Sequence, residues 1–197
     1  MDTNFTKIQE IFEKYVSVPG TEIEFRLGKI NTNMFDTNIG KDMFERITKG
    51  LNKYREWENV VRANTSVYYK NTTRITIDDD TEEITRVHKT PITKTNFKLA
   101  ENILDMRLAV STEIPIVGES SDEVMDAIRT KQRVSFIRKN LSIDCTVVSG
   151  DTVDMDSEDR FRYEIEFEIV DPKNVKTRDE LYNIVQKVFD VLKLIEC

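Results

Sequence analysis

The 197-residue sequence lacks the features that mark secreted and membrane proteins. It contains only two cysteines, Cys145 and Cys197, from which neither a disulfide framework nor a zinc-binding spacing can be built. No apolar run approaches the ~18 residues that a membrane-spanning helix requires, and no signal peptide opens the chain. We therefore expect an intracellular protein that does not associate with a membrane.

Other absences narrow the chemistry. The chain has no Gly-x4-Gly-Lys-Ser/Thr segment, which excludes a P-loop NTPase, and no EF-hand loop, which argues against calcium storage. Its formal net charge of −7 argues against broad wrapping of a nucleic-acid backbone, although a local basic site is compatible with that total. We interpret the one histidine, His88, as an incidental strand residue, because its neighbour Lys89 is the better phosphate ligand. Cys145 shares the apolar parity of Ile143 and Val147, which predicts a core residue and not a nucleophile.

The local patterns predict a few helices and many strands. Apolar stripes of helical period, or capping residues, indicate helices at 3–16, 41–54, 120–128 and 177–192. Period-two alternation predicts strands near 21–30, 57–63, 66–70, 73–78, 82–89, 105–113, 131–138, 141–148 and 160–170. Short gaps favour antiparallel hairpins over βαβ crossovers. Since no linker or repeat divides the chain, we expect residues 1–197 to form one α+β, mainly β, domain.

Two of these strands carry an acidic residue at every second position. The polar faces hold Glu22, Glu24 and Arg26 in one strand, and Glu164, Glu166 and Glu168 in the other. Either strand alone is typical of an amphipathic strand with its polar face in water. Carboxylates spaced in this way repel one another, however, and a hard cation such as Mg²⁺ or Mn²⁺ would compensate because it prefers carboxylate oxygens.

Further strands place basic and polar residues on one face. These residues are Arg74, Arg107 with Ser111 and Glu113, Arg129 with Lys131 and Arg133, and Ser142 with Asp144 and Thr146. A single strand of this kind is typical of a solvated surface. These four strands and the two acidic strands make six with an apolar opposite face, and together they favour a barrel whose polar face points inward. Carboxylates together with Lys and Arg in one interior predict a site for a metal and a polyphosphate.

The Glu-x-Glu-x-Arg pattern at 22–26, together with Glu-x-Glu-x-Glu at 164–168, resembles the triphosphate tunnel metalloenzymes. Within that family the chain looks most like the metal-dependent RNA triphosphatases of fungal and large-DNA-virus mRNA capping systems, and in particular the N-terminal triphosphatase domain of a giant-virus capping enzyme. The resemblance implies a closed antiparallel eight-stranded tunnel with a hydrophilic interior and a few packed helices. It also implies that the chain is the N-terminal part of a larger capping enzyme.

The resemblance also assigns roles to individual residues. It implies that Glu24, Glu166 and Glu168 bind the metal directly, and that Glu22 and Glu164 act nearby through water or hydrogen bonds. It makes Glu113 the residue that orients the attacking water. The remaining positions that it implies are Lys131, Arg133, Arg26, Arg107 and Asp144 as catalytic residues, and Arg74, Lys89, Arg129 and Thr146 as substrate ligands, with Arg86 as an alternative to Lys89.

The activity that the resemblance implies is metal-dependent removal of the γ-phosphate from 5′-triphosphate RNA, the first step of cap formation. Nucleoside triphosphates would be side substrates. We expect Mg²⁺ or Mn²⁺ as cofactor, and guanylyltransferase and methyltransferase domains in cis or in trans. The expected location is intracellular, in a cytoplasmic viral factory or virion if the protein is viral.

Two alternatives stay open at this point. The same interior would suit a tunnel enzyme that acts on inorganic tripolyphosphate, thiamine triphosphate or free nucleotides. It would also suit a non-catalytic β-barrel that binds a phosphorylated ligand. Release of phosphate from triphosphate-ended RNA, ATP and tripolyphosphate distinguishes these possibilities.

Overall fold

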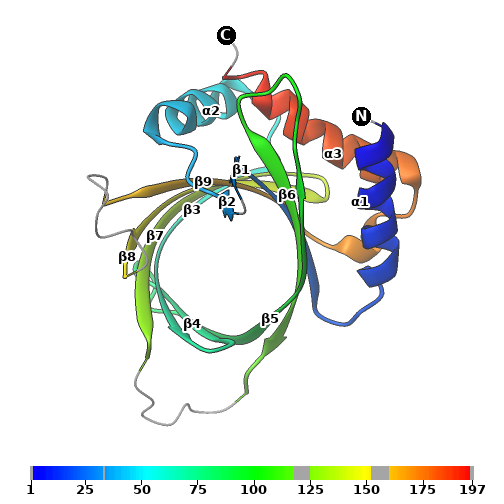
Figure 1. Ribbon diagram of the computed structural model, residues 1–197. Helices are drawn as coiled ribbons and strands as arrows, with labels where there is room; N and C mark the ends of the chain where they lie inside the picture. The colour runs from blue at the N-terminus through cyan, green and yellow to red at the C-terminus, as the bar shows by residue number, and fades with distance from the viewer. Residues whose placement is uncertain (1, 33, 118–124, 152–159, 196–197) are drawn as a thin grey trace.

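The computed structural model describes residues 2–32, 34–117, 125–151 and 160–195. The elements are α1 (Asp2–Tyr15), β1 (Thr21–Asn31), β2 (Met34–Asp36), α2 (Lys41–Lys53), β3 (Asn59–Lys70), β4 (Thr73–Asp78), β5 (Ile84–Phe97), β6 (Asp105–Pro115), β7 (Ala127–Arg138), β8 (Leu141–Gly150), β9 (Arg162–Ile169), the short 3-10 helix η1 (Pro172–Asn174) and α3 (Arg178–Leu192). In Figure 1 the strands form a ring, and the helices lie against one side of it.

The ring is a closed antiparallel barrel. Neighbouring strands follow the order β2-β1-β6-β5-β4-β3-β7-β8-β9, and β1 pairs in addition with β9. This second pairing closes eight strands and leaves β2 as a short hairpin partner of β1. The closing seam places Glu24 opposite Glu168 and Arg26 opposite Glu166. The predicted eight-stranded tunnel is therefore confirmed, with one additional strand.

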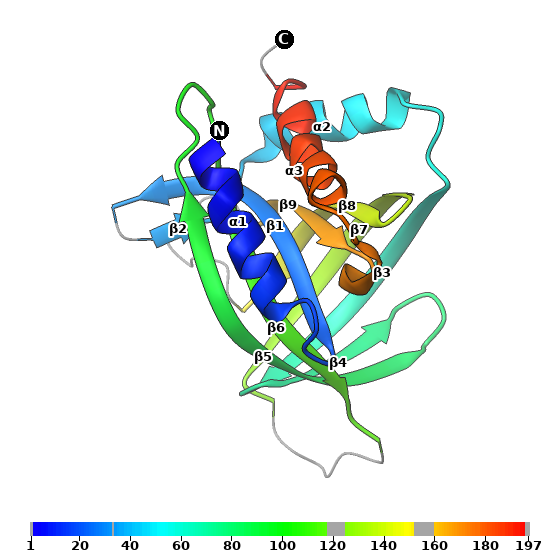
Figure 2. The same cartoon turned by 90° about the vertical axis from the view of Figure 1, so that its right-hand side faces the viewer.

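The hydrophobic core lies outside the barrel, between its wall and the three helices. Phe25 of β1 and Phe167 of β9 are fully buried, and they belong to one apolar cluster with Ile8 of α1, Ile47 of α2 and Val188 of α3. Figures 1 and 2 show the helices on the β1, β6 and β9 side, while none of the described helices covers the β4–β5 wall. Since the apolar faces of the seam strands point toward the helices, their polar faces point into the barrel.

Most predicted elements are confirmed, with small shifts at their ends. Helices predicted at 3–16 and 41–54 correspond to α1 and α2, and the capping box of Thr177 and Glu180 begins α3. The segments 57–63 and 66–70 form one strand, β3. No helix in the described ranges is long and apolar enough to cross a membrane.

Two predictions of secondary structure are wrong in part. The first part of the helix predicted at 120–128, up to residue 124, lies outside the described residues. From Ala127 onward the prediction is wrong, because the chain forms strand β7 and its backbone pairs with β3 and β8. The strand predicted to end near 89 continues to Phe97. It passes Pro91, which has no N–H to donate, through an irregularity between Pro91 and Thr93 where the register with β6 shifts.

The prediction for Cys145 is confirmed. Its side chain is buried in the outer core together with Ile143, and burial raises the pKa of the thiol to about 12. A thiol with such a pKa is not a nucleophile at neutral pH.

Candidate active site in the tunnel

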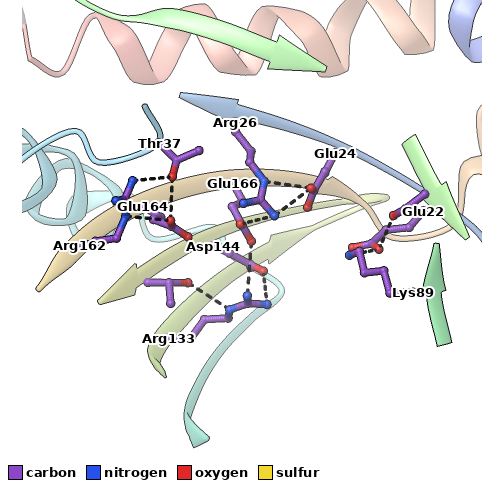
Figure 3. Close-up of polar contacts among 12 residues, drawn as sticks. Glu22, Glu24, Arg26, Thr37, Lys89, Arg133, Asp144, Arg162, Glu164 and Glu166 are labelled. Carbon is purple, nitrogen blue, oxygen red and sulfur yellow. Dashed lines mark hydrogen bonds and ion pairs between the residues drawn. The ribbon is translucent and has the colours of Figure 1, made fainter. Parts of the chain in front are cut away.

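The polar interior of the barrel is built from inward-facing side chains of all eight strands. One space of about 190 Å³ within it is lined by Glu24, Arg26, Arg74, Lys89, Pro91, Lys94, Arg107, Ala109, Val110 and Ser111. These residues come from β1, β4, β5 and β6. The facing wall of β7, β8 and β9 adds Arg133, Asp144 and Glu166. Figure 3 shows Glu166 paired with Arg26 across the closing seam and also with Arg133, which in turn contacts Asp144.

Arg26 lies between two buried glutamates. Its guanidinium is 2.9 Å from Glu24 Oε1 and 2.8 Å from Glu166 Oε1. Both carboxylates are only 6% exposed, so neither is solvated well enough to be charged without a partner. The arginine therefore stabilises the seam at the position where β1 and β9 meet.

Arg133 of β7 bridges the next two strands. It contacts Asp144 Oδ2 at 3.0 Å and Glu166 Oε2 at 3.3 Å, and its Nε donates to Thr146 Oγ1 at 3.1 Å. The Ser142 hydroxyl donates to the other oxygen of Asp144 at 2.6 Å. Residues 131–133 and 144–146 are thus brought together around Glu166. The charge of Lys131 also lowers the pKa of that carboxylate.

A second group lies on the β1, β5 and β6 side. The Lys89 ammonium forms an ion pair with Glu22 and lies 3.0 Å from Glu113 Oε1, while Ser111 Oγ donates to Glu22 Oε2 at 3.1 Å. Lys89 is therefore the tunnel residue. Arg86 is three positions earlier in the same regular strand, opposite Ile75, and so lies on the outer face.

Glu164 is set apart from the seam group. Its carboxylate accepts a hydrogen bond from Thr37 Oγ1 at 2.8 Å and lies 3.9 Å from Arg162 Nε. Arg162 in turn contacts Asp36 of β2 at 2.7 Å. The structure thus places Glu22 and Glu164 in separate hydrogen-bonded groups, while Glu24, Glu166 and Glu168 share the seam.

The three seam carboxylates differ in acidity. Burial, followed by repulsion from Glu166, raises the pKa of Glu24. Burial acts in the same direction on Glu166, but Arg26 and Arg133 outweigh it and lower its pKa to about 2. Burial and the charges of Glu22 and Asp144 raise the pKa of Glu168 to about 7. Repulsion between carboxylates therefore contributes to the raised pKa values of both Glu24 and Glu168.

These carboxylates fit a hard divalent cation. Glu24 and Glu168 face each other directly across β1 and β9, where like charges destabilise a sheet. Within the described ranges, no side chain donates a hydrogen bond to Glu168, and only one oxygen of Glu24 is engaged, by Arg26. The acidic side chains of that part of the chain do not yet converge as a group of three on one point. Their free oxygens are nevertheless the donors that Mg²⁺ and Mn²⁺ prefer.

Three other tunnel arginines have no acidic partner among the described residues. The Arg107 Nε donates to Asn96 Oδ1 at 2.8 Å, and its guanidinium lies 4.5 Å from the centre of the Phe35 ring. Burial and the nearby Arg26 lower the pKa of Arg107. Arg74 and Arg129 both lie beside the ring of Tyr69. Their positive charge is therefore left for an anion.

The sequence reasoning missed Lys94. It lines the 190 Å³ space together with Lys89, although residues five apart in a regular strand would lie on opposite faces. The register shifts between Pro91 and Thr93, so that Lys94 lies on the same face as Lys89. Pro91, two residues beyond the end of the predicted strand, was the available signal, since proline in a sheet marks an edge or a bulge.

Comparisons with known proteins agree with this architecture. A family model described as mRNA capping enzyme, beta chain, matches residues 5–194. The structure of the S. pombe Pct1 RNA triphosphatase superposes with a TM-score of 0.80 at 16% identity, covering 98% of this chain and 92% of that one. The Mimivirus capping enzyme triphosphatase gives 0.68 at 17% identity, covering 98% of each chain. The RNA triphosphatase domain from a study of a trifunctional Mimivirus mRNA capping enzyme gives 0.65 at 18%, covering 100% and 99%. No curated protein matches the sequence.

Proposed function

The chain belongs to the mRNA capping enzyme beta-chain family, the mRNA triphosphatases, and from this premise we propose how its tunnel removes the γ-phosphate of 5′-triphosphate RNA. The products are orthophosphate and a 5′-diphosphate RNA end, as the first step of cap formation requires. The observation that carries the proposal is the division of the tunnel interior. Carboxylates gather at the β1–β9 seam, and the β4, β5 and β6 wall carries Arg74, Lys94 and Arg107, which form no ion pair among the described residues.

Glu24, Glu166 and Glu168 are the residues that would hold a divalent cation. Such an ion neutralises charge on the phosphate oxygens and polarises the γ-phosphorus. Mg²⁺ and Mn²⁺ both suit an all-oxygen donor set. The metal dependence of the reaction is part of the proposal, and it is supported by the repulsion between Glu24 and Glu168.

The protein's own side chains position the triphosphate and the water. Phosphoryl transfer depends mainly on positioning and on stabilising charge, so Lys131 and Arg133 take up the charge that spreads over the γ-phosphate oxygens. Glu113 orients the water and accepts its proton, while Lys89 holds the Glu113 carboxylate. Water attacks the phosphorus in line, the bond to the bridging oxygen breaks, and the β-phosphate leaves with the RNA.

Phosphate release from three substrates tests the proposal. Wild-type protein is given 5′-triphosphate RNA, ATP or tripolyphosphate with Mg²⁺ or Mn²⁺, and released orthophosphate is measured. We expect release from RNA at the highest kcat/KM, weaker release from ATP, and none in EDTA. Glu24→Gln and Glu166→Gln should lose at least the ~10–100-fold that is typical for the loss of a supporting residue at a metal site.

A variant in the connection between β4 and β5 is the matched control. Glu83→Gln removes the charge of an exposed glutamate near the β4–β5 turn and should retain wild-type activity. Absence of phosphate release from all three substrates by the folded wild-type protein would falsify the enzymatic proposal. A preference for tripolyphosphate or ATP over RNA would instead identify a different substrate for the same tunnel.

The proposal extends to the surroundings of the enzyme. The formal net charge of −7 disfavours broad contact with an RNA backbone, so we propose that the protein recognises the 5′ end and little of the following sequence. Guanylyltransferase and methyltransferase activities would then act on the product, as neighbouring domains or separate proteins, inside the cell. Mimivirus has a trifunctional mRNA capping enzyme that contains an RNA triphosphatase domain.

A further inference from the structure

Basic side chains in the tunnel fall into two classes. Arg26, Arg133 and Lys89 each form ion pairs with carboxylates, so much of their charge is balanced inside the protein. Arg74 and Arg129 form no ion pair within the described residues. The Nε of Arg129 is also buried there without a hydrogen-bond partner. A buried, unpaired donor on a cation is costly unless a ligand satisfies it.

Both unpaired arginines lie against one aromatic ring. The guanidinium carbon of Arg74 is 5.5 Å from the centre of the Tyr69 ring, and that of Arg129 is 5.1 Å from it. The β-sheet register explains the arrangement: Tyr69 of β3 is directly opposite Arg74 of β4, and Arg129 of β7 is opposite Val67, two residues along β3. The three side chains thus come from adjacent strands and share one inner face.

An aromatic ring holds a guanidinium in a different way from a carboxylate. The face of the ring attracts the cation through its quadrupole and removes little of its positive charge. It therefore fixes the position of both arginines while their N–H groups stay available for phosphate oxygens, which guanidinium groups bind in a bidentate manner. Arg74 also lines the 190 Å³ space in which Lys94 and Arg107 lie.

We propose that Tyr69 is a positioning residue that holds Arg74 and Arg129 as a clamp for the phosphates of a polyphosphate chain that are not hydrolysed. The identity of the chain as the 5′ end of RNA rests on the proposed function, whereas binding of a polyphosphate does not. The clamp acts on the phosphate farthest from the bond that breaks, whose charge stays the same before and during the reaction, whereas the β-phosphate gains charge as it leaves. The clamp therefore acts on binding and contributes little to the chemical step.

Binding of inorganic tripolyphosphate in EDTA tests the clamp without hydrolysis. Isothermal titration calorimetry should show that Tyr69→Leu weakens the affinity about tenfold, the size expected from losing partly desolvated cation–π contacts. Tyr69→Phe keeps the ring and should restore most of the affinity, because the described contacts use the ring face and not the hydroxyl. Tyr68→Leu, a change in the adjacent tyrosine on the outer face, is the matched control and should bind like the wild type.

Kinetics and a double-mutant cycle separate positioning from a structural role. Tyr69→Leu should raise KM for the RNA substrate about tenfold and change kcat much less. In an Arg74→Ala background, Tyr69→Leu should reduce the affinity for tripolyphosphate by a smaller factor than it does in the wild type, because part of its effect passes through Arg74. Thermal unfolding of each variant shows whether the fold is retained.

The outcomes distinguish the two proposals. If the wild type binds tripolyphosphate in a manner that depends on Tyr69 but releases no phosphate from any substrate, the clamp stands and the proposed function fails. If the wild type is active and folded Tyr69→Leu has wild-type affinity and KM, the clamp is wrong. The clamp would also be wrong if Tyr69→Phe and Tyr69→Leu lost the same affinity for tripolyphosphate. It would be wrong as well if the effects of Tyr69→Leu and Arg74→Ala on that affinity were fully additive.

Discussion

Replacing Asp105 by alanine tests how the end of β1 is tied to the connection between β5 and β6. The carboxylate is 2% exposed and accepts hydrogen bonds from the backbone N–H of Ile30 at 3.0 Å and of Leu99 at 3.1 Å. The Lys98 ammonium contacts it at 3.0 Å from a largely exposed position. These donors outweigh the effect of burial and lower the pKa of Asp105.

The expected loss of stability follows from the donors that the substitution leaves unpaired. A buried N–H without an acceptor costs about 1–3 kcal/mol, so two partly buried amides should reduce the free energy of unfolding by about 2–4 kcal/mol. Asp105→Asn keeps one acceptor oxygen and should lose about half as much. Asp190→Ala, which removes surface ion pairs to Lys187 and Lys193, should cost no more than about 1 kcal/mol.

Urea unfolding at several pH values measures the effect. Since the folded-state pKa of Asp105 lies below its unfolded value, its stabilisation is complete above the unfolded pKa of about 3.9 and disappears as the pH falls through the folded value. The difference between wild type and Asp105→Asn should therefore be constant near neutral pH and shrink below about pH 4. A difference below ~0.5 kcal/mol at pH 7, within the range of ordinary surface substitutions, would refute the reasoning.

Four further outcomes are expected. In EDTA at pH 8, Glu168→Gln should raise the free energy of unfolding by about 0.2–1 kcal/mol, because it removes a partly buried charge that Glu22, Asp144 and Glu24 repel. With metal present, the same variant should have no metal-dependent activity, and added Mg²⁺ should raise Tm only in the wild type. A destabilised variant would contradict this. Because the folded pKa of Glu168 is raised to about 7, metal-free wild type should lose stability as the pH rises from about 4.5 through 7, and Glu168→Gln should show less of this loss. Lys94→Ala should raise KM several-fold with a smaller change in kcat, and an unchanged KM would exclude contact with substrate. Cys145 should remain unalkylated by iodoacetamide at pH 8 until urea unfolds the protein, as peptide mass spectrometry can show.

The position of Lys94 shows where reasoning from alternation stops. Strict alternation would place Lys94 on the other face of the strand from Lys89. Only the register shift near Pro91 brings both side chains into the barrel interior. The helix predicted at 120–128 failed from Ala127 for a related reason. Its capping pattern was weak, and strands β3 and β8 provide ladder partners that local propensity does not reveal.

Much of the site was predictable as a set of residues, but its internal pairing was not. Alternation placed Glu24, Arg26 and Glu166 on polar faces, and family resemblance assigned roles that remain to be tested. The sequence did not reveal that Arg26 and Arg133 share Glu166. Nor did it reveal that Tyr69 lies beside two arginines that form no ion pair with the described carboxylates. Such pairings depend on register between strands, which is a relation between distant segments.

The amino-acid sequence by itself determined which side chains share a strand face, because alternation follows from the local geometry of an extended backbone. It also determined α3, whose capping box satisfies its first N–H groups within a few residues. Alternation also predicted that the polar faces point inward, but only the tertiary structure decided which strands meet and which side chains face each other. Pairing of β1 with β9 closes the barrel and the helices bury its apolar outer face, so the polar faces must converge. That closure sets Glu24 against Glu168, and it turns two separate acidic strands into one site.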